Sequence, residues 1–162
     1  MTLVATILPT PVGPLTVVVS DVGLRAVLWQ VERDGRVRLP EFRLGEHPVL
    51  TDATIQLGQY FAGERFAFEL PLDLVGTGFQ LAIWQGLAQI PYGETSTYAA
   101  EATRLGRPAA TRAAGGAIGR NPVSIVLPCH RVIGASGALT GFAGGIGAKR
   151  WLLEHEGVRL SA

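Results

Sequence analysis

The sequence predicts an α+β protein: a small N-terminal antiparallel β-sheet with one helix, followed by a mostly helical C-terminal part with a winged-helix-like helix-turn-helix. Three observations support this fold class. Aliphatic and β-branched runs alternate with turns in the first half, and apolar residues recur at helical spacing in the second half. The stretch "PLDLVGTG" (residues 71–78) separates the two textures. We therefore expect two domains, residues 1–75 and 76–162.

The first half contains β-rich runs that are separated by "PTPVGP" and "DVG", which are typical turn sequences. This pattern predicts a meander of short strands, then a polar loop and a helix that Thr51 caps and that ends at Gly63. The expected elements are strands over residues 3–8, 15–20 and 24–31, a loop over 33–47, a helix over 51–63 and one more strand over 65–70.

The second half begins with a capping-box pattern, Thr77 with Gln80, before an apolar helical stretch. Pro108 follows a short Gly-containing turn and suits the first turn of a further helix. Helix, short turn and helix together outline a helix-turn-helix, although many helix pairs that do not bind DNA share this outline. The expected elements are helices over 79–90, 96–106 and 108–119, a turn and strand over 121–132 that ends near Cys129, a glycine-rich loop over 134–148 and a final helix over 149–157.

Composition excludes several classes of protein. A single cysteine cannot form an internal disulfide, so we expect a reducing, cytoplasmic location. The N-terminus lacks the basic region of a signal peptide, and no stretch approaches the roughly 20 apolar residues that span a membrane. The net charge of +1 divides into −3 for residues 1–76 and +4 for residues 77–162. The basic half could bind a polyanion, or it could carry ordinary surface charge.

Two common types of ligand site are not predicted. The glycine-rich loop lacks the Gly-Lys-Ser/Thr sequence of a phosphate-binding P-loop, because Lys149 follows Ala148 and precedes Arg150. One cysteine and three histidines, with His47 far away in the other half, do not supply four zinc ligands. We expect no cofactor and no metal.

Cys129 is a candidate nucleophile, although a lone cysteine is often a small buried hydrophobe. It lies in "LPCHRV", and the neighbouring His130 and Arg131 could lower the pKa of its thiol. His155 and Glu156 on the last helix add an imidazole and a carboxylate. A relay is therefore possible, in which a carboxylate orients an imidazole that takes the thiol proton.

The second helix of the helix-turn-helix has an unusual composition for a helix that reads bases. Arg112 is its one long polar side chain, among small residues such as Ala113, Gly115 and Gly116. Such a face cannot read a sequence through base edges, but it can approach DNA closely. This suits a protein that searches DNA of any sequence for a damaged base and flips it out.

Three segments in this order and spacing resemble the O6-alkylguanine-DNA alkyltransferases: "IPYGETSTY", "RAAGGAIGRNPVSIVLPCHRVIG" and "KRWLLEHEG". The resemblance is close over residues 72–160, whereas the first 70 residues match only in length and general character. It implies a DNA repair protein that flips O6-alkylguanine, and also O4-alkylthymine, out of duplex DNA. The alkyl group would pass irreversibly to Cys129, once per molecule.

The resemblance also implies roles for individual residues. Cys129 resembles the nucleophile, His130 the general base that acts through a water, and Glu156 the carboxylate that orients it. Asn121 is similar to a hinge asparagine, and Tyr98 to the tyrosine that contacts the target phosphate and assists guanine N3.

Further roles concern DNA and the base. Arg112 resembles the finger that replaces the flipped nucleotide, beside Ala113, Gly115 and Gly116 on the DNA-binding helix. Val132 resembles a wall of the base pocket, and His155 matches no catalytic residue of the family, so it is expected at the surface or in packing. Phe142 stands where many members have Tyr, and Ala143 stands where some have Ser, so neither offers a side-chain hydroxyl.

The expected partner is double-stranded DNA, bound by a monomer through the minor groove without sequence preference and without a membrane. Two other functions compete with this one. A non-catalytic lesion-binding protein of the alkyltransferase-like type would lack the cysteine, so Cys129 argues against it. A cysteine hydrolase would need an acyl-binding cleft that no sequence feature suggests.

Overall fold

The computed structural model describes residues 2–160, which form two compact units. The first unit holds the chain up to Val75 together with Pro122–Val126, and the second holds Gly76–Asn121 together with the chain from Leu127 onward. The chain thus leaves the second unit after Asn121 and returns to it at Leu127. That residues 1–75 and 76–162 are separate domains stays a prediction.

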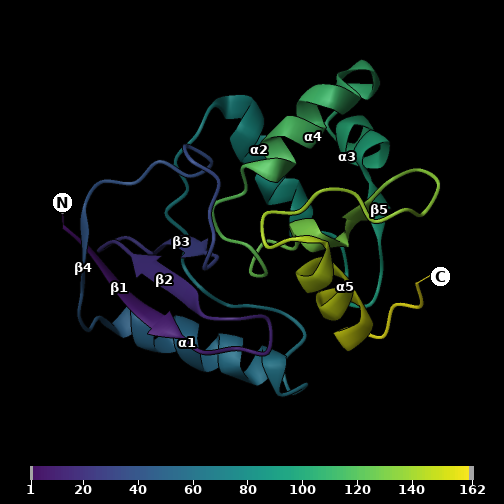
Figure 1. The fold of residues 1–162 in the computed structure, drawn as a ribbon. Helices are drawn as coiled ribbons and strands as arrows, with labels where there is room; N and C mark the ends of the chain where they lie inside the picture. Colours follow the sequence, from purple (N-terminus) through teal and green to yellow (C-terminus); the bar gives the residue numbers. More distant parts are fainter. Residues whose placement is uncertain (1, 161–162) are drawn as a thin grey trace. The chain divides into compact units, whose positions relative to one another are not determined.

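The first unit contains a four-stranded sheet in the order β3-β2-β1-β4 (Figure 1). The strands are β1 (Leu3–Leu8), β2 (Leu15–Val19), β3 (Leu24–Leu28) and β4 (Phe42–Leu44). β1, β2 and β3 are antiparallel neighbours, as predicted, and Leu3, Ala5, Val18 and Ala26 form a fully buried apolar cluster. β4 pairs parallel with β1, so the sheet is mixed and the expected loop over 33–47 contains a strand. β4 escaped prediction because its three residues are exposed and too short for an alternating pattern.

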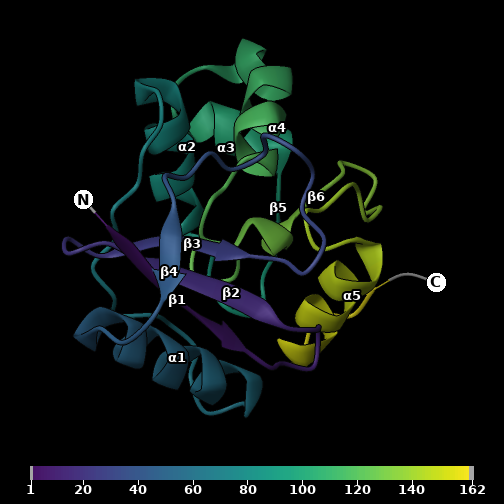
Figure 2. The same ribbon diagram turned by 60° about the vertical axis from the view of Figure 1, so that its left-hand side comes forward.

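The helix of the first unit is α1 (Pro48–Phe61), which packs against β1, β2 and β3 (Figure 2). It begins one turn earlier than predicted, because the His47 side chain, not Thr51, accepts a hydrogen bond from Val49 N at 3.1 Å. The strand expected over 65–70 is absent. The Gln56 side chain instead bonds both backbone groups of Glu69, at 2.9 and 3.0 Å, and so takes the place of a neighbouring strand.

The second unit contains the predicted helix-turn-helix. Its elements are α2 (Gly78–Leu87), β5 (Ser96–Thr97), α3 (Tyr98–Arg104), η1 (Pro108–Ala110), α4 (Thr111–Gly119), η2 (Cys129–Arg131), β6 (Val132–Ile133) and α5 (Ile146–His155). The capping box of Thr77 and Gln80 is confirmed. α2 also packs against α4, and Trp84 Nε1 donates to Ala117 O at 2.8 Å. No helix within residues 2–160 is long and apolar enough to cross a membrane.

Residues 122–126 do not form the predicted strand. Val123 makes one isolated bridge to Val27, and Trp29 Nε1 donates to Ser124 Oγ at 3.1 Å. The chain turns at Ile125, whose φ of 75° is strained for a β-branched residue. Such a backbone costs on the order of 1–3 kcal/mol and persists only where the surrounding structure imposes it. The turn interrupts the apolar run, so Cys129 opens a 3-10 helix and does not lie on a strand.

Candidate active site

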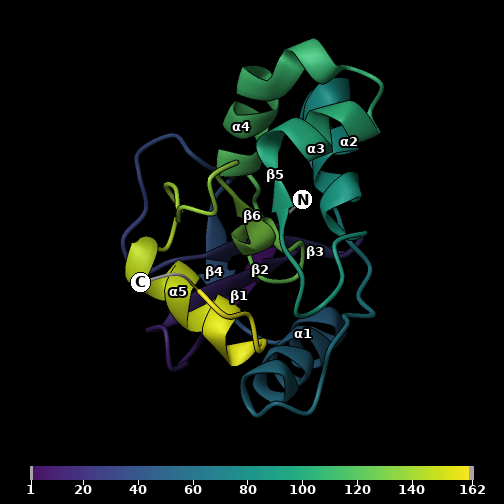
Figure 3. The same cartoon turned by 90° about the vertical axis from the view of Figure 1, so that its right-hand side faces the viewer.

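A two-stranded parallel pairing brings distant segments of the second unit together. Ser96 pairs with Val132 and Thr97 with Ile133, so β5 and β6 lie side by side (Figure 3). β5 leads directly into Tyr98, the first residue of α3, and β6 follows directly after η2. One pairing therefore positions both Tyr98 and the segment that carries Cys129.

Cys129 is buried, with 5% of its surface exposed, and a shared acceptor fixes the turn before it. Its backbone N donates to Leu127 O at 2.8 Å, and Asn121 Nδ2 donates to the same carbonyl at 2.8 Å. Asn121 is fully buried. Its amide therefore links the two ends of the segment 122–126, just before the chain reaches the thiol.

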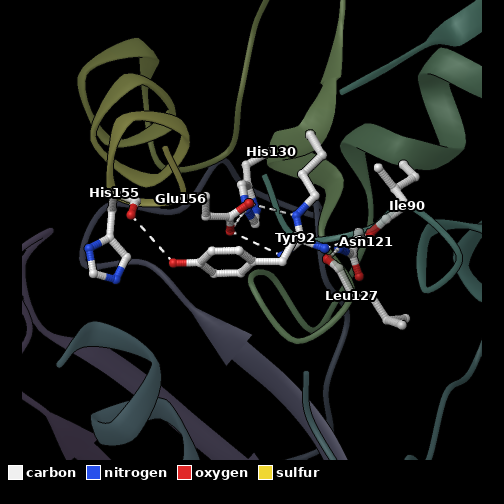
Figure 4. Close-up of polar contacts among 8 residues, drawn as sticks. Ile90, Tyr92, Asn121, Leu127, His130, His155 and Glu156 are labelled. Atoms are coloured by element: carbon white, nitrogen blue, oxygen red, sulfur yellow. Dashed lines mark hydrogen bonds and ion pairs between the residues drawn. The ribbon is translucent and has the colours of Figure 1, made fainter. Parts of the chain in front are cut away.

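The structure brings His130 and Glu156 together, as the sequence suggested. His130 Nε2 lies 2.7 Å from Glu156 Oε2, and both side chains are completely buried (Figure 4). Arg131 donates two hydrogen bonds to the same carboxylate, from Nε to Oε1 at 2.7 Å and from Nη2 to Oε2 at 3.1 Å. Arg131 Nη1 also donates to Ile90 O at 2.6 Å. Because Arg131 faces Glu156, its predicted role as a cationic neighbour of the thiol is replaced by a role in holding the carboxylate.

Burial and charge act in opposite directions on this pair. Burial would raise the pKa of Glu156, but the hydrogen bonds and charges of His130 and Arg131 outweigh it and lower the pKa well below its usual range. Burial lowers the pKa of His130, and the contact with Glu156 offsets this only in part. His130 is therefore a neutral base at physiological pH. Its Nδ1 atom is buried without a hydrogen-bond partner among the described residues, so this nitrogen is the one left to accept a proton.

Tyr98 belongs to a second polar chain that the sequence did not reveal. Its hydroxyl lies 2.5 Å from Thr140 Oγ1. Lys149 Nζ, on α5, reaches Thr140 Oγ1 at 3.4 Å, Thr140 O at 3.4 Å and Val132 O at 2.6 Å. Lys149 is 1% exposed, and burial lowers its pKa to about 8 against the attraction of the Cys129 thiolate. Nothing in the sequence around Lys149 signalled this burial, because the segment has the composition of a surface helix.

Apart from Tyr98, which begins α3, the residues expected to contact DNA lie on one helix, α4. Arg112, Ala113 and Gly116 are exposed. Gly115 is half-buried beside Tyr98, and a Cβ added to it would lie 3.5 Å from the Tyr98 ring. A small residue at position 115 thus allows α4 to approach Tyr98 closely. The exposed face of α4 has no long polar side chain apart from Arg112, as predicted.

The expected pocket residues lie on β6 and on the loop that follows it. Val132 is fully buried, and Phe142 and Ala143 are half-buried. Outside this group, the His155 ring stacks on Trp151 at 4.7 Å, which agrees with the expected packing role. Within residues 2–160, no three His, Cys, Asp or Glu side chains are grouped so that they could hold a metal ion.

Comparisons with known proteins agree over both units. The family model described as the DNA binding domain of 6-O-methylguanine DNA methyltransferase matches residues 78–158, and that of its ribonuclease-like domain matches residues 3–74. The chain belongs to the 6-O-methylguanine DNA methyltransferase family. This confirms the family, the enzyme class and the α+β fold class that the sequence predicted.

Individual relatives cover nearly the whole chain. A methylated-DNA–protein-cysteine methyltransferase of Methanosarcina acetivorans is 42% identical over 93% of this chain and 96% of its own. That of Mycobacterium bovis is 44% identical over 94% and 92%. The structure also resembles that of Mycobacterium tuberculosis OGT in complex with DNA, with a TM-score of 0.85 and 42% identity over 96% of this chain and 92% of that chain.

Proposed function

We propose that this protein repairs DNA by taking the alkyl group of O6-alkylguanine onto Cys129. The observation that supports this most strongly is the buried series of Cys129, His130 and Glu156, in which Glu156 occupies Nε2 of the imidazole and leaves Nδ1 for the thiol proton. A buried cysteine with only a packing role would not need an oriented base next to it. The relatives named as methylated-DNA–protein-cysteine methyltransferases support the same assignment.

The transfer is a displacement at the alkyl carbon. His130 Nδ1 takes the thiol proton, directly or through a water, and Glu156 stabilises the imidazolium that results. The Cys129 thiolate then attacks the alkyl carbon, an S–C bond forms, and the C–O6 bond breaks with its electron pair passing to guanine. Tyr98 donates a proton to guanine N3 as this charge develops. The thioether is inert and the sequence contains no second thiol to resolve it, so each molecule acts once.

Apart from Tyr98 on α3, the proposed DNA contacts lie on α4. Its exposed small residues allow the helix to enter the minor groove without reading sequence, and Arg112 takes the place of the nucleotide that flips into the site. Phe142 stacks on the extruded base beside Val132 and Ala143.

O4-alkylthymine is proposed as a second substrate, and the protein is proposed to act as a monomer in the cytoplasm.

The decisive test is the intact mass of the protein after incubation with a duplex that contains O6-methylguanine. The wild type should gain the mass of one CH₂ group on the peptide that contains Cys129, with one duplex repaired per molecule. Cys129→Ser should bind the duplex and leave the lesion in place, because a hydroxyl is a far weaker nucleophile at neutral pH. A repaired duplex with that variant would rule out Cys129 as the acceptor. Binding by the wild type without any mass gain would favour the lesion-binding alternative.

Flipping is tested separately with Arg112→Ala. This variant should repair duplex DNA more slowly and react normally with free O6-benzylguanine, which needs no flipping. Arg120→Ala, at the exposed C-terminal end of α4, is the matched control for loss of one positive charge. If Arg112→Ala slows both reactions equally, Arg112 serves the active site and not the flipped state.

A further inference from the structure

Lys149 is a buried cation to which the mechanism above assigns no task. It is 1% exposed, and its hydrogen-bond partners are neutral oxygens of Val132 and Thr140. An ammonium ion without a carboxylate partner is expensive to bury, so folding alone does not favour a lysine at this position. The cost of keeping Lys149 here suggests a task in the chemistry.

The polar chain from Lys149 to Tyr98 has a defined direction. An ammonium group has donors only, so Lys149 Nζ must donate to Thr140 Oγ1. The Thr140 hydroxyl proton is then free to point at Tyr98, and the Tyr98 oxygen can accept it across the 2.5 Å contact. With its oxygen occupied in this way, Tyr98 directs its own O–H away from Thr140. A chain that began at a carboxylate would run in the opposite sense: Thr140 would donate to the carboxylate, Tyr98 would donate its O–H to Thr140, and Tyr98 would have no proton left for another group.

We propose that Thr140 and Lys149 are positioning residues that orient the Tyr98 hydroxyl as the proton donor to the leaving guanine. This inference rests on the proposed function, in which Tyr98 meets the extruded base. When guanine takes the Tyr98 proton, Tyr98 recovers one from Thr140, and Thr140 recovers one from the Lys149 ammonium. Lys149 is left as a neutral amine that takes a proton from solvent, and the thiol proton remains on His130, so all protons are accounted for.

The charge state of Lys149 suits this task. With a pKa near 8, its ammonium is a stronger acid than that of an exposed lysine, yet it remains protonated at neutral pH. The titratable groups that act on it are Cys129, whose thiolate attracts it, His130, whose pKa its charge lowers, and Tyr98 through Thr140. The relay should therefore fail as the pH rises through about 8.

The test compares Thr140→Val, which removes the hydroxyl at nearly constant volume, with Thr140→Ser, which retains it. Single-turnover alkylation of Cys129 by O6-benzylguanine should slow roughly tenfold or more in Thr140→Val and little in Thr140→Ser. The decline in rate above about pH 8 should persist in Thr140→Ser and disappear in Thr140→Val. Iodoacetamide, whose leaving iodide needs no proton, should alkylate Cys129 at the same rate in both variants.

Equal rates and equal pH profiles for the two Thr140 variants would overturn the inference while wild-type alkylation by O6-methylguanine duplex still stood. Parallel losses with iodoacetamide would also overturn it, because they would place the effect on the thiol. Failure of the wild type to become alkylated would contradict the proposed function itself, so the two ideas fail by different results. Comparing the unfolding midpoints of the two variants shows whether either change in rate reflects lost structure.

Discussion

The two ends of α5 hold buried ionisable groups in opposite situations. Glu156, at the C-terminal cap, has two cationic or basic partners, and its charge is stabilised. Lys149, in the first turn, has neutral oxygens around it, and its charge is destabilised. Burial alone therefore does not decide whether the charged form of a side chain is stable, because its hydrogen-bond and charge partners also contribute. The comparison predicts that Glu156 contributes to both stability and reactivity, whereas Lys149 contributes to reactivity at some cost to stability.

The largest effect is expected for Glu156→Gln. The neutral amide leaves the Arg131 guanidinium buried without a counter-charge, and the free energy of unfolding should fall by about 3 kcal/mol, toward the low end for a broken buried pair. Alkyl transfer should slow as well, because His130 loses the carboxylate that orients it. Denaturant unfolding and single-turnover kinetics measure the two losses. A slow but fully stable variant would show that Arg131 does not depend on Glu156.

The next effect should come from alkylation itself. A methyl group on Cys129 adds volume to a site that is 95% buried, and such overpacking typically costs about 1–3 kcal/mol. A thioether also cannot ionise, so the attraction between Cys129 and Lys149 is lost and the pKa of Lys149 should fall further. Thermal unfolding of stoichiometrically alkylated protein, freed of DNA, should show a lower Tm than the untreated form. An unchanged or higher Tm would contradict the packing argument.

Lys149→Met should change stability least. The loss of a costly buried charge is offset by the loss of a donor to Val132 O, so the free energy of unfolding at pH 7 should stay within about 1 kcal/mol of the wild type. Transfer from O6-methylguanine should nevertheless slow by roughly tenfold or more, as expected for Thr140→Val, because both changes interrupt the proton relay to Tyr98. A large fall in the free energy of unfolding with an unchanged rate of alkyl transfer would contradict the prediction, because Lys149 would then serve stability and not reactivity.

The sign of the pH dependence sharpens the same contrast. The pKa of Lys149 is lower in the folded protein, so between about pH 8 and 10.5 the unfolded chain binds more protons and wild-type stability should rise relative to Lys149→Met. The rise should be less than about 1.4 kcal/mol per pH unit. The lowered pKa of Glu156 acts in acid, where its contribution to stability is lost as the pH falls below 4.5, the ordinary pKa of a glutamate carboxyl. Unfolding curves for the wild type and the two variants across both ranges test these signs.

Local signals predicted much of this structure, and long-range contacts account for most of what they missed. The Thr77–Gln80 capping box and the pairing of His130 with Glu156 followed from short motifs and from family resemblance. The prediction of a strand over 65–70 was wrong because the Gln56 side chain, and not a neighbouring strand, hydrogen-bonds the backbone N and O of Glu69. Lys149 and Thr140 were missed because their significance depends on Tyr98, which lies 42 residues before Thr140 in the chain.

The excursion of residues 122–126 has a consequence for the order in which the protein can form. A ribosome releases the N-terminal half first, and domains generally fold as they emerge. In this chain the partner that accepts from Val27 N is Pro122 O, and the partner of the Trp29 indole is Ser124. The first unit therefore cannot complete its own β3 edge until Gly76–Asn121 of the second unit have been made. Cys129 lies three residues after Val126, the last residue of the first unit, so its thiol leaves the ribosome only after the first unit has all of its segments.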